Sequence, residues 1–396
     1  MTGPFWPLAV SSWGPRERAA AHAVIDGDHQ TMGARVREFE AAFARHVGAK
    51  HAVMTNSGSS ANLLMVAAMR YLFDYRPRYL EVIVPAIAWA TTYAPLQQHG
   101  YRLVVCDVDP RTLNIDVAEV RAAITPATVA VVGVSILGSP APLLELEVLC
   151  TEHGLLLLED NCESLGAKIG DRYCGTFGAA GTFSFFFSHH LSTAEGGALV
   201  TDDAAIYELA VCLRAHGWSR DLPPNSSLRP IYEADDLGGA YQFLIPGYNV
   251  RPTELTAAVG LVQLDRLADF EDARRANHQL FVNLFSGDER WEIQHPNGRA
   301  VPFGFTLVLR TPEARGRASR ALTEAGIEHR LITGGSFARH PAAGRYSWRY
   351  ATERGAPHAD HAHDRGLFVG NHAADLTEQI ETLYKILNKE ITSFEG

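Results

Sequence analysis

Lysine is scarce in this sequence. The 396 residues include four lysines, at Lys50, Lys168, Lys385 and Lys389. Lys50 follows an amphipathic helical pattern, Lys168 lies beyond an acidic strand end, and the other two belong to a terminal helical pattern. None ends a strand where the active site of a parallel sheet is expected. We therefore do not expect an active site in which a lysine side chain forms a covalent bond to a ligand.

Long apolar runs and an excess of positive charge are also missing. No apolar stretch approaches the roughly 20 residues that cross a membrane, and the first residues contain no basic segment followed by an apolar one. The formal net charge of -10 supplies no general basic face for a phosphate backbone. We therefore expect a cytoplasmic protein that binds neither membrane nor nucleic acid, while local groups of arginine still allow an anionic small-molecule substrate.

The cysteines are few and widely spaced. They are Cys106, Cys150, Cys162, Cys174 and Cys212. No two lie closer than twelve residues, so the spacing of a zinc or iron–sulfur site is absent. We expect reduced thiols, mostly buried, with neither a metal site nor an iron–sulfur cluster.

The spacing of apolar residues predicts an α/β region. A helix is expected over 34–47, because apolar residues recur there at helical spacing and Gly48 supplies a stop. Near-continuous apolar strands favour a mostly parallel sheet that is buried on both faces, with its ligand site at the carboxyl ends of the strands. The strand-like runs are 51–55, 80–84, 103–108, 129–136, 155–159, 182–187 and 198–201.

The segment 219–247 has a different composition, rich in proline, asparagine, serine and glycine. It is predicted to be a long irregular loop that covers the substrate or bridges two subunits. Pro252 is expected to open the next helix, with an apolar side that extends to Leu267.

Beyond about residue 270 the pattern becomes α+β. A strand is expected at 303–309 and a helix at 314–325, with another helix close to the C-terminus. We therefore predict a large α/β domain over 1–250 and a smaller α+β domain over 251–396.

Two strand ends carry residues suited to a phosphate and to a charged ring. The segment 55–62 joins a strand to a helical pattern, and its small residues leave backbone N–H groups free to bind phosphate at a helix N-terminus. Such Ser-Gly-Ser turns are also often ordinary turns with a capping serine. Asp160 ends an apolar strand, where a carboxylate can pair with a protonated pyridine nitrogen or simply cap a helix. From these residues alone, both alternatives stay open for each segment.

The segment 181–190 has the outline of a cofactor-binding loop. An apolar strand carries Ser184, a reactive side chain, His189, follows five residues later, and a Glu-Gly-Gly turn begins six residues after that. This outline resembles the lysine loop of the pyridoxal-phosphate sugar aminotransferases named after DegT, DnrJ and StrS. In that family a lysine at this point holds the cofactor as a Schiff base. Imidazole moves protons but does not form that stable bond, so the resemblance implies a cofactor held without a covalent link.

The resemblance extends over nearly the whole chain. Further matching segments lie at 31–33, 57–59, 89–93, 159–164, 188–190, 214–218 and 366–372. It implies fold type I of the pyridoxal-phosphate transferases, which is aspartate aminotransferase-like, with a large domain built on a mostly parallel sheet and a smaller α+β C-terminal domain. Within the family the likeness is greatest to the coenzyme B6-dependent sugar 3-dehydratases.

Cofactor contacts follow from the resemblance residue by residue. The implied cofactor-binding residues are Gly58, Ser59, Trp89, Asp160, Glu163, Ser184 and Asn249. Trp89 would stack on the ring, although an aromatic residue after a strand is more often core, and Glu163 would lie near the phenolic oxygen. Asn249 would reach the phosphate of a neighbouring subunit, which implies an obligate homodimer with a shared active site.

The resemblance also implies a reaction. An amino group passes from L-glutamate to pyridoxal 5'-phosphate, which gives pyridoxamine 5'-phosphate, and a nucleotide-linked 4-keto-6-deoxyhexose then loses its C3 hydroxyl. The expected substrate is GDP-4-keto-6-deoxy-D-mannose and the expected product a 3-deoxy-4-keto sugar. His189 is the candidate catalytic base, and as imidazolium it can protonate the leaving oxygen.

Several other polar residues are candidate substrate contacts. They are Ser188, His216, Arg251 and Arg330. The arginine fork suits a diphosphate or the carboxylates of glutamate, although most arginines are surface residues. His216 stands in a loop-like stretch, where a lone histidine is more often structural. Alternation along an extended segment turns His190 away from His189, so a structural role is expected for it.

Three rival functions remain. A nucleotide-sugar or nucleoside-sugar aminotransferase or dehydratase of an antibiotic pathway could use the same residues, although the missing lysine speaks against simple transamination. A dehydratase with its own iron–sulfur cluster would need cysteine spacing that is absent. A regulatory protein without activity would be expected to lose the cofactor residues, and Ser59, Trp89 and Asp160 are present.

Overall fold

The computed structural model describes residues 5–73, 80–229 and 241–391. The main sheet consists of β1 (His51–Thr55), β2 (Glu81–Pro85), β3 (Arg102–Cys106), β4 (Thr128–Val134), β5 (Leu156–Asp160), β8 (Ala180–Ser184), β9 (Gly197–Thr201) and β13 (Trp348–Tyr350). The helices around it are α1 (Pro15–Ile25), α2 (Ala34–Val47), α3 (Gly58–Leu72), α4 (Ala90–Gln98), α5 (Val117–Ala123), η1 (Ile136–Gly138), α6 (Leu143–His153), α7 (Ala204–Arg214) and α9 (Glu254–Asp265).

A second group of elements lies toward the C-terminus. It contains α10 (Leu267–Phe285), β10 (Trp291–Glu292), β11 (Gly304–Leu309), α11 (Pro312–Glu324), β12 (His329–Arg330), η2 (Ile332–Gly334), η3 (Phe337–Arg339), η4 (Pro341–Arg345), α12 (Pro357–Arg365), β14 (Gly366–Gly370) and α13 (Thr377–Glu390). A short hairpin is formed by β6 (Lys168–Ile169) and β7 (Arg172–Tyr173).

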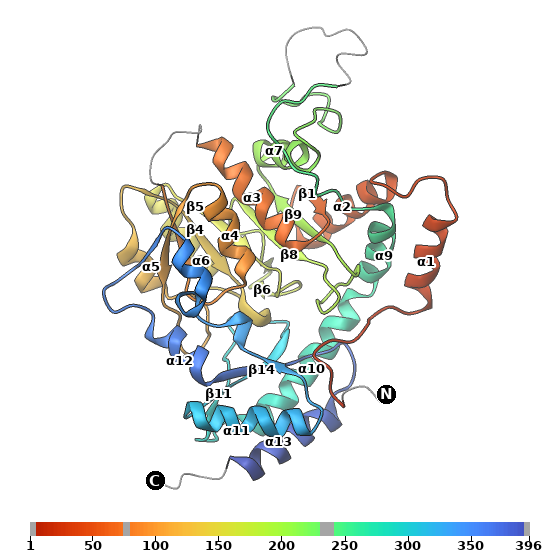
Figure 1. Cartoon of the computed structure of the whole chain (residues 1–396). Helices are drawn as coiled ribbons and strands as arrows, with labels where there is room; N and C mark the ends of the chain where they lie inside the picture. Colours follow the sequence, from red (N-terminus) through yellow and green to blue (C-terminus); the bar gives the residue numbers. More distant parts are fainter. Residues whose placement is uncertain (1–4, 74–79, 230–240, 392–396) are drawn as a thin grey trace.

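The main sheet is mostly parallel, as predicted. Its strand order is β1-β9-β8-β5-β4-β2-β3-β13, with helices on both faces (Figure 1). Within this sheet β9 runs antiparallel to both neighbours, β1 and β8, and the other pairings are parallel. The smaller sheet is antiparallel, in the order β10-β11-β14-β12, and α11 and α13 lie beside it at the lower end of the view (Figure 1). This arrangement confirms the predicted fold class.

The main sheet is buried on both faces because alternate residues of its apolar strands enter different cores. In β2, Val82 and Val84 belong to one apolar cluster, whereas Ile83 packs with Val104 in the cluster on the opposite face. Helix α2 matches its predicted bounds and ends at Gly48, whose φ of 78° is the left-handed conformation that glycine adopts readily.

Two predicted elements need correction. The strand predicted at 182–187 ends at Ser184, since the sheet register with β9 stops there and the chain turns into a loop. Helix α9 begins at Glu254 rather than Pro252, because the Thr253 side chain caps it by accepting a hydrogen bond from the backbone N–H of Thr256. Leu267, expected on the same helix, starts α10 instead.

The predicted domain boundary between residues 250 and 251 stays a prediction. Two segments pack with the domain on the other side of that boundary. Trp6 is buried in the core of the small sheet, where its indole packs edge-on against Phe305. Strand β13, from the C-terminal part of the sequence, extends the main sheet by parallel pairing with β3. In the predicted 219–247 loop, the described parts form turns and the isolated bridge Trp218 to Phe243, and residues 230–240 lie outside the described residues.

The helices of the described chain include none with the length and apolar character of a membrane span.

Candidate active site

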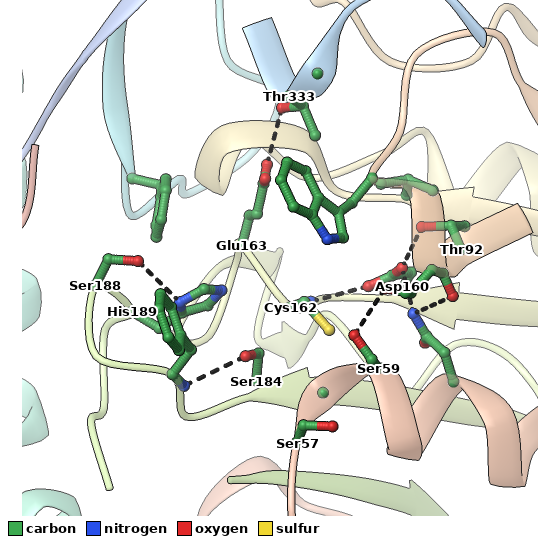
Figure 2. Close-up of a pocket in the computed structure, with 18 of the residues that line it drawn as sticks. Ser57, Ser59, Thr92, Asp160, Cys162, Glu163, Ser184, Ser188, His189 and Thr333 are labelled. Atoms are coloured by element: carbon green, nitrogen blue, oxygen red, sulfur yellow. Dashed lines mark hydrogen bonds between the residues drawn. The ribbon is translucent and has the colours of Figure 1, made fainter. Parts of the chain in front are cut away.

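A cavity of about 530 Å³ lies at the carboxyl ends of β5 and β8 and is also lined by residues from the small-sheet region. Figure 2 shows Asp160 and Thr92 at one end and Ser188 and His189 at the other, with Glu163 between them. We refer to these as the Asp160 end and the His189 end. The position agrees with the rule that ligands bind at the carboxyl edge of an open α/β sheet.

The Asp160 carboxylate is held by several donors. Oδ2 accepts hydrogen bonds from Asn62 Nδ2 at 2.8 Å and from Thr92 Oγ1 at 2.7 Å, and Oδ1 accepts one from the backbone N–H of Cys162 at 3.2 Å. Asn62 is itself fixed, because its Oδ1 accepts a hydrogen bond from Thr182 Oγ1 at 2.6 Å. Asp160 is 5% exposed. These bonds fix the carboxylate where it can accept a hydrogen bond from a ligand in the cavity.

The N-terminus of α3 borders the same end of the cavity. Ser57 caps the helix and Gly58 is its first residue. Ser57 accepts hydrogen bonds from the N–H groups of Ser60 and Ala61, so the N–H groups of Gly58 and Ser59 are the ones that can bind a ligand at the cavity wall. A Cβ on Gly58 would lie 2.5 Å from Cβ of Ser184, so only glycine permits this approach of α3 to β8. The hydroxyls of Ser59 and Thr91 are hydrogen-bonded at 2.8 Å. Helix N-terminus, glycine and serine hydroxyls together suit a phosphate group.

Trp89 forms part of the cavity wall next to the N-terminus of α4. Its side chain is 53% exposed, unusual for so large an apolar residue. The turn at Gly334 lies across from it, since a Cβ at that glycine would be 3.8 Å from Cε3 of Trp89. An exposed indole in a cavity wall can stack on a planar ligand.

The His189 end is mainly apolar. The imidazole packs edge-on against Phe186 and Phe303, with ring centroids 5.9 and 5.0 Å away. Its Nδ1 lies 3.3 Å from Oγ of Ser188. Burial, and secondly the charge of Arg274, lower the pKa of His189 to about 3, so the ring is neutral at physiological pH. A neutral imidazole that borders a cavity can accept a proton.

The segment that carries His189 starts and ends at the same place in the sheet. Ser184 at the end of β8 faces Gly197 at the start of β9. Beyond that pair, the backbone N–H of Phe185 still donates to the carbonyl of Gly196 at 2.8 Å. A Cβ on Gly197 would be 2.5 Å from the backbone nitrogen of Gly58, so glycine is required at this end of the segment.

Glu163 connects two backbone turns across the cavity. Its Oε2 accepts hydrogen bonds from the backbone N–H of Leu137 at 2.8 Å and from Oγ1 of Thr333 at 3.2 Å. Both partners have left-handed backbone conformations, with φ of 51° and 40°, which cost energy for residues other than glycine. Burial raises the pKa of Glu163 to about 7, although the bond from Leu137 acts in the opposite direction.

Most of the predicted site residues meet in this cavity. Its lining includes Gly58, Ser59, Trp89, Asp160, Glu163, Ser184, Ser188, His189 and Arg330. The remaining predicted residues do not line it and lie together beyond α7. Asn249 Oδ1 accepts a hydrogen bond from Nε of Arg251 at 3.0 Å, and the backbone N–H of His216 donates to the carbonyl of Tyr248 at 2.6 Å. Asn249 and His216 are exposed.

Several lining residues were not predicted from the sequence. Thr92 and Asn62 had a local signal, since they lie three residues beyond Trp89 and Ser59 on helices that start at the cavity. Phe303 and Leu8 had none, because only the packing of distant segments brings them to the wall. Cys162 also lines the cavity, and burial raises its pKa well above the ordinary value.

The four lysines are all described, and none of them lines the cavity. The five cysteines are free thiols. Within the described ranges, no group of three or more His, Cys, Asp or Glu side chains is arranged to hold a metal ion.

Comparison with known proteins adds an independent finding. The sequence pattern of the DegT/DnrJ/EryC1/StrS aminotransferase family matches residues 12–388. A GDP-4-keto-6-deoxy-D-mannose 3-dehydratase of Yersinia pseudotuberculosis is 42% identical over 389 residues, which cover 97% of this chain and 98% of that protein.

Solved structures resemble the chain over almost its full length. One is a GDP-4-keto-6-deoxymannose-3-dehydratase with a trapped adduct of PLP and glutamate, with a TM-score of 0.93, 39% identity and coverage of 96% of this chain and 100% of that one. Another is a mutant of such an enzyme with bound GDP-perosamine, with a TM-score of 0.92 and the same identity and coverage.

Proposed function

Because the chain belongs to the DegT/DnrJ/EryC1/StrS aminotransferase family, we propose that it is a coenzyme B6-dependent 3-dehydratase of a nucleotide-linked 4-keto-6-deoxyhexose. The substrate is GDP-4-keto-6-deoxy-D-mannose, the amino donor is L-glutamate, and the product is a 3-deoxy-4-keto sugar. The observation that carries this proposal is His189, a neutral histidine in a cavity that no lysine lines. The similar dehydratases support the substrate and the donor.

The residues of the cavity fit pyridoxal phosphate and its amine form. The first turn of α3 with Gly58 and Ser59, together with Ser184, would hold the phosphate. Asp160 would accept the proton of the pyridine nitrogen, and Trp89 would cover the ring. When bound, the cofactor supplies an amino group and an electron sink that makes loss of the C3 hydroxyl feasible.

His189 would move the proton that this elimination requires. With Nδ1 next to the Ser188 hydroxyl, Nε2 is the ring nitrogen left to accept a proton. The resulting imidazolium can return that proton to the departing C3 hydroxyl, so the oxygen leaves as water and the histidine becomes neutral again. The apolar rings of Phe186 and Phe303 pack against the imidazole and favour its neutral form.

The absence of a covalent link can be tested by borohydride reduction of the protein with bound pyridoxal phosphate. We expect the protein mass to remain unchanged, because no lysine lines the cavity. The variant His189→Lys is the positive control, and it should gain one phosphopyridoxyl group on reduction. A reduced adduct on Lys50, Lys168, Lys385 or Lys389 of the unmodified protein would show that a lysine does reach the cofactor.

The reaction itself can be tested with pyridoxal phosphate, L-glutamate and a panel of nucleotide-linked 4-keto sugars. A dehydratase should give a sugar product that has lost one oxygen atom, together with 2-oxoglutarate and ammonia. An aminotransferase would give a product in which nitrogen replaces the C4 oxygen. A stable amino sugar as the main product would reject the dehydratase and restore the aminotransferase.

We also propose that the enzyme is a homodimer in which each subunit completes the active site of the other. Arg330 brings a positive charge to the cavity lining, which also contains Asp160, Glu163 and Glu195. An anionic diphosphate substrate calls for further cationic groups. Arg251, Asn249 and His216 lie outside this cavity, where a second subunit could receive them, as the resemblance to the family implies.

Hybrid dimers test the shared site. A His189→Asn chain and an Asn249→Ala chain should each have little activity alone. Mixed dimers should recover part of it, because one of their two sites would combine an intact His189 with an intact Asn249. Proven hybrid dimers without any recovery would contradict a shared site, and a fully active monomer would contradict the dimer itself.

A further inference from the structure

Arg274 in α10 is a buried arginine directly behind the His189 segment. Its side chain is 4% exposed. Nη2 donates a hydrogen bond to the main-chain carbonyl of His189 at 3.4 Å, and Nη1 donates one to the carbonyl of Asn371. The guanidinium therefore contacts the backbone of the candidate base itself.

Arg274 lacks the partner that a buried arginine usually has. In the described part of the chain, no Asp or Glu forms an ion pair with it, and its Nε has no hydrogen-bond partner. Burial lowers the pKa of Arg274 only to about 10, so it remains charged at neutral pH. An uncompensated buried charge is costly for the fold. Such a cost is expected mainly at functional sites.

Asn371 links Arg274 to the segment that carries Phe303. Its Nδ2 donates to the carbonyls of Arg274 at 2.9 Å and Pro302 at 3.0 Å, and its backbone N–H donates to the carbonyl of Phe303 at 3.0 Å. Phe303 in turn packs against the His189 ring. One arginine thus supports the backbone of His189 directly and the wall beside its ring through Asn371.

We propose that Arg274 is a positioning residue that contacts His189 at its main-chain carbonyl and, as a buried cation without a carboxylate partner among the described residues, adds to burial in disfavouring protonation of the imidazole. Its charge opposes a second positive charge nearby, so the protonated form of His189 is short-lived and readily gives its proton away. The role of His189 as the base rests on the proposed function. The effect of Arg274 on the proton affinity of His189 is independent of that function.

Other charged or titratable groups surround this pair. From the elements packed around it these are His190, Glu195, Glu271, Arg275, His278, His372, Asp160, Glu163 and Arg330. Arg275 offers a matched control, because it follows Arg274 on α10 but is paired with Glu271 at 3.3 Å and Asp272 at 2.7 Å. Because the charge of Arg275 is balanced by these carboxylates, its removal should change the proton affinity of His189 little.

The test is an NMR titration of ring-labelled histidine in the protein with bound pyridoxal phosphate, with the His189 signal assigned by its loss in His189→Asn. Arg274→Met should raise the proton affinity of His189 at least about tenfold, which corresponds to about one pKa unit. Arg274→Lys, which keeps the charge, should stay close to the unmodified protein, and Arg275→Met should not differ from it. If Arg274→Met does not fold, Arg274→Gln replaces it in the comparison with Arg274→Lys.

An unchanged titration in the neutral variants would overturn the proposal, as would an equal shift in Arg274→Lys. With substrate, the acid limb of kcat/KM should move to higher pH in Arg274→Met in step with the NMR midpoint. Because the His189 carbonyl also loses its contact with the guanidinium, kcat at pH 7 should fall more than KM rises. If no nucleotide sugar is turned over, the proposed function fails while the titration still decides the effect of Arg274.

Discussion

The two ends of the cavity are built on opposite principles. At the Asp160 end, a carboxylate accepts three hydrogen bonds from Asn62, Thr92 and Cys162 on three different segments. At the His189 end, the imidazole packs edge-on against two aromatic rings, and its polar contact among the described residues is the long one with Ser188. The first end stabilises a charge, and the second keeps a titratable group uncharged.

This difference separates binding from proton transfer. A carboxylate fixed by several donors needs no rearrangement to receive a positively charged ring atom, so it is suited to hold a cofactor throughout the reaction. A weakly bonded histidine in apolar surroundings changes its protonation state with little competition from other partners. Substitutions at the two ends should therefore affect different measured quantities.

Asp160→Asn should have the largest effect, because it weakens cofactor binding and with it every step that follows. It removes the charge that would face the pyridine nitrogen, and the loss of one partner from a buried charge pair costs about 3–5 kcal/mol. We expect pyridoxal phosphate to bind roughly two to four orders of magnitude more weakly, as measured by fluorescence titration. Asp203→Asn, at the cap of α7, is the control and should bind normally. Normal cofactor affinity in Asp160→Asn would show that the Asp160 end does not hold the cofactor by its charge.

His189→Asn should leave cofactor affinity nearly unchanged and reduce kcat by roughly 10²–10⁴-fold, because an amide does not accept the proton. Affinity and rate measured on the same preparation separate the two ends of the cavity. The exposed His153 provides the control His153→Asn, which should retain full activity. Turnover close to normal in His189→Asn would transfer the base to another group, and His216 would be examined first.

Glu163→Gln tests the middle of the cavity. The folded pKa of Glu163 is raised to about 7, so its carboxyl contributes stability that is fully present below pH 4.5 and is lost as the pH rises through about 7. In the protein without cofactor, the free energy of unfolding of the glutamine variant should therefore increase relative to that of the unmodified protein between pH 5 and pH 8. The expected increase is on the order of 1–3 kcal/mol. Urea unfolding of both proteins at these pH values measures the gain. If the two proteins differed in stability by the same amount at pH 5 and at pH 8, the raised pKa of Glu163 would be contradicted.

Ser188→Ala should have the smallest effect. The distance of 3.3 Å between its Oγ and His189 Nδ1 indicates a weak bond, so we expect a loss of about 0.5–1.5 kcal/mol in kcat/KM and none in cofactor affinity. Steady-state kinetics with the keto sugar checks it, with Ser286→Ala at the end of α10 as the control. A drop as large as that of His189→Asn would show that the hydroxyl takes part in proton transfer.

Sequence patterns predicted the fold well where a local pattern and the tertiary packing favour the same element. The alternation of apolar residues on strands such as β2 and the glycine stop of α2 are local features that the fold retains. The strand predicted through Phe187 failed because an apolar run does not reveal where its pairing partner ends.

The candidate site was predictable in part. Asp160, Ser184 and His189 follow from a strand end and a recognisable loop, and they line one cavity. Leu8, Phe303 and Arg274 come from distant parts of the chain, and only tertiary packing brings them to the site. No periodicity of the sequence encodes that Arg274 is buried or that it has no carboxylate partner among the described residues.

The pairing of Ser184 with Gly197 takes the chain between them out of the sheet and back into it at adjacent positions. This loop is anchored in the core, since Phe185, His190 and Leu191 are buried. The side chain of residue 189 lines the cavity instead, so its replacement leaves the buried anchors in place. The residue that meets the ligand and the residues that hold the loop can therefore change separately.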